Sequence, residues 1–274
     1  MERDVAVVIG VGGMGQAIAR RVGLGRQLLI ADVSQQTLDA AARELEGEGY
    51  AVTAATVDVS SRESVAALAK QAAALGPVRA VAHTAGLSPE QAPVSAVLAV
   101  DLLGVALVLE EFGQVVAPGG AGVVIASMAG HFQPPPAPED ARALATAPAD
   151  ELLALPVAAE ANFANSGSAY AFAKRANQLR VQGASTAWGA RGARVNSISP
   201  GIIATPMGQA ELSGESGAVM RMMIDASNAR RLGTPADIAA AAEFLLSPAA
   251  SFISGADLLV DGGAAAAVNT GQLG

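Results

Sequence analysis

Residues 5–15 read Val-Ala-Val-Val-Ile-Gly10-Val-Gly12-Gly-Met-Gly15, a short apolar run followed at once by three spaced glycines. The apolar run predicts a buried strand, and the residues after Gly12 predict a helix. In such a unit the first glycine permits a tight turn, the second lets the backbone approach a pyrophosphate, and the third lets helix and strand pack closely. The helix N-terminus adds free N–H groups and a positive dipole end. The stretch therefore predicts a dinucleotide-binding turn, although the glycine pattern alone is weak in a chain with 30 glycines.

The rest of the chain repeats this alternation of short apolar runs and longer helical patterns. Strands are expected at Val5–Gly10, Gln27–Asp32, Ala51–Asp58, Val78–Thr84, Gly122–Ser127, Ala193–Ser199 and Asp257–Asp261. Helices are expected at Met14–Val22, Gln35–Glu48, Arg62–Leu75, Pro93–Val116, Ser168–Trp188 and Pro235–Leu246. Strands that are apolar throughout and separated by helices predict a parallel sheet covered on both faces. We therefore expect α/β architecture: one doubly wound Rossmann domain over residues 1–274, with about seven strands.

Two segments interrupt this rhythm. The segment at 131–167 begins His-Phe-Gln-Pro-Pro-Pro-Ala-Pro, and its proline run excludes helix or central strand. Two short helices are expected after it, at Glu139–Ala145 and Ala149–Leu155. The segment at 201–231 carries glycines, serines and a methionine cluster, a composition suited to a mobile substrate lid. An ordinary helix packed on the core explains the second segment equally well.

Composition excludes several kinds of function. The net charge of −8 and the isoelectric point near 4.8 argue against a nucleic-acid or anionic-membrane surface. The chain has no cysteine and only two histidines, so neither a thiolate nucleophile nor a metal site rich in these residues is expected. The first apolar run has no basic segment before it and is too short to span a membrane. We expect a cytoplasmic protein without metal, nucleic-acid or membrane partners.

Asp32 ends the second expected strand, 17 residues after Gly15. A carboxylate at this position can accept hydrogen bonds from adenosine ribose hydroxyls and would repel a 2′-phosphate. Residues 31–36, Ala-Asp-Val-Ser-Gln-Gln, contain no arginine or lysine to attract that phosphate. This favours NAD over NADP. Alternatively, Asp32 serves only as a helix N-cap, a role that Ser34 can also fill.

Tyr170 and Lys174 are four residues apart in a chain with two tyrosines and two lysines. On a helix this spacing puts both side chains on one face, one turn apart. An ammonium beside a phenol favours the phenolate and is expected to lower the tyrosine pKa toward the range of a general acid or base. Taken alone, the pair is better explained as a surface contact, so the rest of the chain must decide.

Together these stretches resemble the short-chain dehydrogenase/reductase family along nearly the whole chain. The resemblance rests on the glycine loop, Val-Asp58-Val, Thr-Ala85-Gly86, Ser127-Met-Ala-Gly, Tyr170-x-x-x-Lys174, Arg194-Val-Asn-Ser-Ile-Ser-Pro200-Gly201 and Leu-Val-Asp261-Gly-Gly. Within the family, Ala187-Trp-Gly, Arg230-Arg-Leu-Gly and Leu-Ser247-Pro-Ala-Ala-Ser resemble the bacterial 3α-hydroxysteroid dehydrogenase/carbonyl reductases.

The resemblance implies roles for individual residues. Tyr170 would be the catalytic acid or base, Lys174 would lower its pKa and hold the nicotinamide ribose, and Ser127 would donate to the substrate oxygen. Asp101 stands where the family has an asparagine that helps to relay protons. The implied cofactor-binding residues are Gly10, Gly12, Met14, Gly15, Asp32, Asp58, Val59, Ala85, Gly86, Tyr170, Lys174, Pro200, Gly201, Ile203 and Thr205.

The chain departs from the family pattern at several positions. The glycine loop is one residue short, with Ile9 where threonine is usual, and His83 replaces an asparagine and is expected to be a packing residue. Asp101 keeps the size of an asparagine and its ability to accept hydrogen bonds, but it loses the amide donor and adds a charge near Lys174, so we expect an altered pH profile. Ser127 and Tyr170 are 43 residues apart, which the insert at 131–167 explains. The insert should either cover the substrate pocket or alter the helix-mediated dimer surface common in the family, unless it is only a surface loop.

The resemblance implies NAD-dependent interconversion of a secondary alcohol and a ketone by a homodimer or homotetramer. A largely apolar pocket walled by the insert and Met220–Ile224 would suit a steroid or another hydrophobic ketone. Two alternatives remain: a nucleotide-sugar epimerase or dehydratase on the same fold, which the short glycine loop favours, and a non-catalytic NAD-binding sensor, in which Asp101 marks lost activity.

Overall fold

The computed structural model describes residues 3–90, 92–214 and 216–272. These residues form a parallel sheet of seven strands in the order β3-β2-β1-β4-β5-β6-β7. The strands are β1 (Val5–Ile9), β2 (Gln27–Asp32), β3 (Ala51–Thr56), β4 (Val78–His83), β5 (Val116–Ile125), β6 (Arg194–Pro200) and β7 (Asp257–Val260). The expected doubly wound α/β fold is confirmed.

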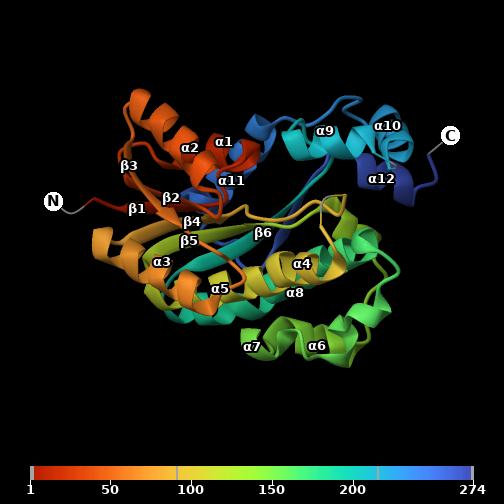
Figure 1. Cartoon of the computed structure of the whole chain (residues 1–274), viewed down its shortest axis with the longest axis horizontal. Helices are drawn as coiled ribbons and strands as arrows, with labels where there is room; N and C mark the ends of the chain where they lie inside the picture. Colours follow the sequence, from red (N-terminus) through yellow and green to blue (C-terminus); the bar gives the residue numbers. More distant parts are fainter. Residues whose placement is uncertain (1–2, 91, 215, 273–274) are drawn as a thin grey trace.

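Helices connect the strands and cover both faces of the sheet, as Figure 1 shows. The α-helices are α1 (Gly13–Val22), α2 (Gln35–Gly47), α3 (Arg62–Leu75), α4 (Val94–Val97), α5 (Val105–Val115), α6 (Pro138–Thr146), α7 (Ala149–Leu152), α8 (Ser166–Ala190), α9 (Pro206–Ser213), α10 (Gly217–Ala226), α11 (Pro235–Leu246) and α12 (Ala264–Asn269). The shorter helical turns are η1 (Leu98–Gly104), η2 (Met128–Phe132), η3 (Pro156–Ala158), η4 (Glu160–Asn162) and η5 (Pro248–Ala250). None of the helices in the described ranges combines the length and the apolar character needed to cross a membrane.

The sheet separates two apolar cores because side chains alternate between its faces. In β1, Val5, Val7 and Ile9 face the core formed with α3, α5 and α8. The intervening Ala6 and Val8 face the core formed with α1, α2 and α11. All five residues are fully buried, which is why this strand is apolar throughout instead of alternating with polar residues.

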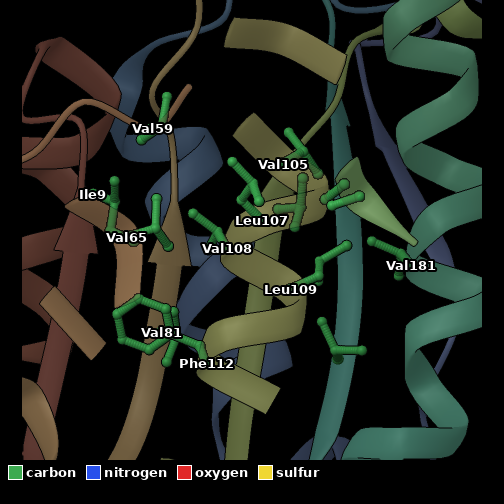
Figure 2. Packing of buried hydrophobic residues seen from close by; sticks show 14 of the residues in the cluster. Ile9, Val59, Val65, Val81, Val105, Leu107, Val108, Leu109, Phe112 and Val181 are labelled. Atoms are coloured by element: carbon green, nitrogen blue, oxygen red, sulfur yellow. The ribbon is translucent and has the colours of Figure 1, made fainter. Parts of the chain in front are cut away.

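Helix α5 supplies much of the first core. Figure 2 shows Val108 and Phe112 of this helix directed toward the sheet, near Val81 of β4. Val59 and Val65 extend the same cluster toward α3. This packing fixes the position of the loops that leave the carboxyl ends of the strands.

Those loops carry the predicted site residues. The chain crosses from the β1-β2-β3 side of the sheet to the β4-β7 side between β1 and β4, and ligands of open α/β sheets bind at such a switch point. Gly10 follows β1, Asp32 ends β2, and Ser127 comes two residues after β5. One edge of the sheet therefore gathers residues that are far apart in sequence.

The expected continuous helix Pro93–Val116 is wrong in two respects. The chain forms α4, then the π-helical turn η1, then α5, and Val116 begins β5 instead of ending a helix. Within η1, Asn177 Nδ2 of α8 donates to the carbonyl oxygen of Asp101 at 2.8 Å. A side chain that enters the backbone hydrogen-bond ladder is a known cause of such an irregularity. The other expected elements occur with end shifts of a few residues, largest at β5 and α7.

The insert at 131–167 packs against the outer surface of α5 and α8, and Figure 1 shows α6 and α7 beyond α8. Arg180 of α8 is buried there and donates to the carbonyl oxygen of Ala147. Glu110 of α5 accepts from the backbone N–H of Ala149 at 2.8 Å. Helices α6 and α7 of the insert therefore lie on the outer helix surface and not over the pocket.

Candidate active site

The three glycines of the glycine loop, Gly10, Gly12 and Gly15, have different surroundings. Gly10 has φ +88°, and a Cβ there would lie 2.5 Å from the backbone nitrogen of Ala85. A Cβ on Gly15 would lie 1.9 Å from the carbonyl oxygen of Gly10. A Cβ on Gly12 would meet no atom within 4 Å, and no side chain caps the N-terminus of α1. Gly10 and Gly15 thus close the turn, while Gly12 leaves the helix N-terminus open to an anion.

Asp32 lies at the far end of the same cleft. Its Oδ2 accepts from the backbone N–H of Val11 and its Oδ1 from that of Ser34, both at 2.9 Å. Each carboxylate oxygen keeps a second lone pair for a ribose hydroxyl. The N-cap of α2 is Ser34, whose side chain accepts from the N–H of Thr37, so Asp32 is not needed for that role.

The remaining expected adenine-side residues line this cleft as well. Asp58 Oδ1 accepts from both the backbone and the hydroxyl of Ser60, which shapes the turn after β3. The cleft is continuous with a second pocket, because the two share lining residues. The shared residues are Met14, Thr84, Gly86, Leu87, Thr205 and Met207.

Ser127, Tyr170, Lys174 and Asp101 all line the second pocket. Tyr170 and Lys174 lie on α8, whose N-terminus is fixed by a capping box between Asn165 and Ser168. Lys174 Nζ lies 5.3 Å from the centre of the Tyr170 ring and 3.0 Å from Asp101 Oδ1. The sequence-derived set is therefore brought together in space.

The Asp101–Lys174 pair is almost completely buried. Asp101 Oδ2 also accepts from the backbone N–H of Leu87 at 3.1 Å, and Lys174 Nζ donates to the carbonyl oxygen of Ile125 at 3.3 Å. Burial alone would lower the pKa of Lys174, but Asp101 and Tyr170 raise it, and the net direction is upward. Lys174 therefore stays an ammonium.

The net effect on Tyr170 differs from the expectation. Burial raises the pKa of Tyr170, Lys174 lowers it, and the negative charge of Asp101 raises it again, so that the pKa lies above its ordinary value. The expected lowering by Lys174 is confirmed as a contribution, but the expected net lowering is wrong. The main physical reason is burial of the phenol, and the negative charge of Asp101, 3.0 Å from the ammonium, adds to it.

Ser127 follows β5 and begins the turn η2. Its Oγ accepts from the backbone N–H of Ala129 at 3.2 Å, so its own hydrogen remains available for donation. A hydrogen bond with Ser127 also lowers the pKa of Tyr170. This arrangement allows both hydroxyl groups to act on one substrate oxygen.

The segment after β6 also borders the pocket. Pro200 ends β6, and a Cβ on Gly201 would lie 2.7 Å from Cα of Asp261, so only glycine fits there. Ile203 pairs with Gly233 in an isolated bridge, and Thr205 caps α9 through the backbone N–H of Gly208. The expected nicotinamide-side residues therefore border the pocket on β6 and the start of α9.

The pocket walls differ from the expectation in two places. Of the insert, only Phe132 and Gly167, near its two ends, are among the described lining residues, so α6 and α7 do not form a wall of the pocket. Met220 lines the pocket, but Ile224 is not among the described lining residues. His83 is buried at the end of β4, and burial lowers its pKa to about 3, which agrees with the expected packing role.

Two residues beside the candidate site were not expected from the sequence. Asn177 lies three residues after Lys174, on the same face of α8, and holds the carbonyl oxygen of Asp101. The spacing of Tyr170, Lys174 and Asn177 on one helix was a usable signal. Glu211 of α9 also lines the pocket, and nothing in its local sequence indicates this.

Comparisons with known proteins agree with this geometry. Residues 4–138 match the family model described as short chain dehydrogenase, and residues 140–265 match the model described as enoyl-(acyl carrier protein) reductase. The short-chain dehydrogenase/reductase bsc3 of Alternaria brassicicola is 40% identical over 267 residues, which cover 97% of each chain. The solved structure of levodione reductase is 26% identical, covers 96% of this chain and 98% of its own, and has a TM-score of 0.77.

The expected subgroup likeness is also present. A 3-alpha-hydroxysteroid dehydrogenase/carbonyl reductase of Comamonas testosteroni is 33% identical over 186 residues, covering 65% of this chain and 69% of its own. These matches support an oxidoreductase and do not support the nucleotide-sugar epimerase or dehydratase alternative.

Proposed function

The chain belongs to the short-chain dehydrogenase/reductase family of oxidoreductases, and from that premise we propose that it interconverts a secondary alcohol and a ketone with NAD as the cofactor. The observation that carries this proposal is the meeting of Ser127, Tyr170 and Lys174 in a pocket continuous with the glycine-loop cleft. A bound nicotinamide dinucleotide supplies the hydride for carbonyl reduction or accepts it in alcohol oxidation.

Tyr170 transfers the proton. In reduction its hydroxyl gives a proton to the carbonyl oxygen, and in oxidation its phenolate removes the proton of the alcohol. Because the pKa of Tyr170 is raised, the hydroxyl form prevails at neutral pH. Reduction should therefore proceed well at neutral pH, whereas oxidation should increase as the pH rises toward that pKa.

Ser127 and Lys174 assist this proton transfer. Ser127 donates a hydrogen bond to the substrate oxygen and stabilises the negative charge that develops there. Lys174 stabilises the phenolate of Tyr170, since its ammonium lies over the ring and lowers the tyrosine pKa against the opposing effect of burial. Lys174 would also hold the nicotinamide ribose.

The adenosine end of the cleft supports the choice of NAD. Asp32 would accept from the ribose hydroxyls and repel a 2′-phosphate, and the described residues lining the cleft include no arginine or lysine. Gly12 and the uncapped N-terminus of α1 would receive the pyrophosphate.

The proposal extends to the wider setting of the enzyme. A cysteine-free chain suits the reducing cytoplasm, and the family resemblance supports a homodimer or homotetramer. The substrate is a small carbonyl or alcohol compound that fits beside Met220, Phe132 and Ile202. The apolar character of these residues supports a hydrophobic body for that compound.

A substrate panel with a matched pair of tyrosine variants tests the reaction. The wild-type protein should reduce or oxidise some members of a panel of cyclic and steroid ketones and alcohols, followed at 340 nm with NADH or NAD. Tyr170→Phe should reduce kcat by about 10²–10⁴-fold, the usual contribution of a general acid or base. Binding of NAD, measured by calorimetry, should be nearly unchanged.

Tyr50→Phe is the control, because Tyr50 is the only other tyrosine and its hydroxyl donates to the carbonyl oxygen of Arg20, away from the pocket. It should keep full activity. NAD binding without turnover on any panel member would favour the non-catalytic sensor, and equal losses in both tyrosine variants would contradict the assigned role of Tyr170.

A further inference from the structure

Helix α9 directs a carboxylate into the pocket that holds Ser127 and Tyr170. This residue, Glu211, is half-buried and lines the pocket together with both hydroxyl groups. Ser88 Oγ donates to Glu211 Oε1 at 2.9 Å, and Ser88 is itself fully buried. The buried serine therefore holds the carboxylate in place at the pocket wall. In Figure 1, α9 lies on the opposite side of the sheet from α6.

The carboxylate of Glu211 has unused capacity for hydrogen bonds. Among the residues that the structure describes, Ser88 is its one hydrogen-bond donor, and it reaches only Oε1. An ionised carboxylate can accept about four hydrogen bonds. A half-buried carboxylate that borders a pocket and lacks further protein donors favours a donor from the pocket's occupant.

The charges around Glu211 restrict that occupant. Besides Glu211, Glu90 and Asp101 add carboxylates to the pocket, and Lys174 is the one basic side chain among the described lining residues. The charge of Lys174 is matched by Asp101 at 3.0 Å. An anionic group near Glu211 would therefore meet repulsion without a free cation to offset it.

The rest of the pocket is largely apolar around these carboxylates. Its described lining includes Leu87, Met128, Phe132, Ile202, Met207 and Met220. Glu211 is also within electrostatic reach of the reacting groups, because its charge raises the pKa of both Tyr170 and Lys174. One molecule with an apolar body can thus contact the reacting hydroxyl groups and Glu211 together.

We propose that Glu211 determines substrate specificity: it accepts a hydrogen bond from a second hydroxyl group of a neutral, hydroxylated alcohol or ketone and disfavours anionic analogues. This inference rests on the proposed oxidoreductase function. It changes the expected substrate from a purely hydrophobic ketone to one with an additional hydroxyl group away from the reacting carbon.

A matched set of cyclohexane alcohols tests the inference. The three positional cyclohexanediols, cyclohexanol and 4-hydroxycyclohexanecarboxylate share one ring and differ in carrying a second hydroxyl, no second group or a carboxylate. With NAD, the wild-type enzyme should oxidise at least one diol with kcat/KM about tenfold above that of cyclohexanol, the effect of one net hydrogen bond to a charged group. The carboxylate compound should be the poorest substrate.

Two substitutions separate the charge of Glu211 from its hydrogen-bonding capacity. Glu211→Leu should bring the ratio of kcat/KM for the diol to that for cyclohexanol close to one, because kcat/KM for the diol falls about tenfold more than kcat/KM for cyclohexanol. Glu211→Gln should preserve most of the diol preference, because the amide still accepts, and should increase kcat/KM for the carboxylate compound by about tenfold. Glu139→Gln changes an exposed carboxylate on α6 and is the control. It should leave kcat/KM unchanged for the diols, for cyclohexanol and for the carboxylate compound.

The remaining outcomes count against the inference. An equal loss on every substrate in Glu211→Leu would mean that Glu211 only supports the fold of the pocket. A wild-type enzyme that is active on cyclohexanol without diol preference would overturn the inference and leave the proposed function standing. NAD binding without turnover of any alcohol or ketone would overturn the proposed function and the inference together.

Discussion

At the scale of single residues, Asp101 acts on the pKa of both members of the proposed catalytic pair, Tyr170 and Lys174. Its carboxylate lies 3.0 Å from Lys174 Nζ and is completely buried, and it raises the pKa of both Lys174 and Tyr170. A carboxylate here holds the ammonium charged but weakens its effect on the phenol. Asp101 therefore keeps Lys174 charged and at the same time opposes the effect of Lys174 on the pKa of Tyr170.

Replacing Asp101 by asparagine should shift the pH dependence of alcohol oxidation. Loss of the negative charge removes one cause of the raised pKa of Tyr170, so the pKa falls and the phenolate forms at lower pH. The rising limb of kcat/KM for oxidation in Asp101→Asn should move toward acid by about one pH unit, as expected for removal of a nearby like charge. A pH–rate profile of both proteins measures this. An unchanged profile would show that Asp101 does not act on Tyr170.

The proposed preference for NAD over NADP rests on Asp32. The wild-type protein should bind NAD more tightly than NADP, because the carboxylate repels a 2′-phosphate. Asp32→Asn keeps the size and one acceptor oxygen, so it should narrow the ratio of the two dissociation constants by about tenfold, equivalent to about 1.4 kcal/mol. Calorimetric titration with both dinucleotides measures the ratio.

Asp39→Asn on α2 provides the control for this substitution, since Asp39 is exposed and accepts from Gln35 on the same helix. It should leave the ratio unchanged. If Asp32→Asn keeps the wild-type ratio of the NAD and NADP dissociation constants, Asp32 does not distinguish a ribose 2′-hydroxyl from a 2′-phosphate.

At the scale of elements, the insert depends on a close approach between α6 and α8. A Cβ on Gly183 of α8 would lie 2.1 Å from the carbonyl oxygen of Ala145. Arg180, one turn earlier, donates to Ala147 and lies 3.3 Å from Glu110. Gly183 thus permits the close contact between α6 and α8, and Arg180 connects the insert to Glu110 of α5.

Gly183→Ala should loosen the insert because the added methyl group meets backbone atoms that cannot move aside. Overpacking of this kind typically costs about 1–3 kcal/mol of unfolding free energy. Thermal unfolding should show a lower Tm, and limited proteolysis should cleave within 131–167 more readily. Gly189→Ala is the control on the same helix, because a Cβ there meets nothing within 4 Å. Equal behaviour of the two variants would contradict the packing described for α6.

A network of polar side chains links β6, β7, η2 and α8. Asp257 of β7 accepts from Ser197 at 2.6 Å and Ser199 at 3.0 Å, and it lies 2.8 Å from His131 Nε2 at the start of the insert. Gln178 of α8 donates to Ser199 at 3.0 Å. Through Ser199 of β6, these hydrogen bonds connect β7 and η2 to α8. The insert therefore begins in η2 and ends in α8, two elements that this network holds together.

At the scale of the whole molecule, cofactor binding should stabilise the fold because the cleft is assembled from several strand ends. A ligand present at 100 times its dissociation constant adds about 2.7 kcal/mol. At about 2–4 °C per kcal/mol, the Tm should rise by about 5–10 °C with saturating NAD. Differential scanning fluorimetry measures the shift.

Gly12→Ala should remove most of this stabilisation without harming the apo fold. Its added methyl group meets no protein atom within 4 Å but occupies the space through which a pyrophosphate would approach. Gly47→Ala, in α2, also meets nothing within 4 Å and should keep the full NAD-dependent shift. If Gly12→Ala retains the shift, the dinucleotide does not bind at this loop.

Local patterns were sufficient to predict the architecture and the main members of the site. The alternation of apolar runs and helical segments, the glycine loop, and the spacing of Tyr170 and Lys174 are properties of short stretches, and each acts through backbone geometry or helix periodicity. Parallel strands end at one edge of a sheet, so residues that follow strands, such as Ser127 and Gly86, are brought together once the fold class is known.

Other features depended on contacts between segments that are distant in sequence. The π-helical turn at Asp101 involves Asn177 on another helix, the net pKa of Tyr170 is the balance of burial against two opposite charges, and Glu211 enters the pocket because Ser88 holds it. The insert lies on α8 because Gly183 leaves room for it. Burial, electrostatic balance and close packing are sums over neighbours in space. The sequence alone therefore determined the fold and the candidate site residues, while the tertiary structure decided their electrostatic balance and the shape of the pocket.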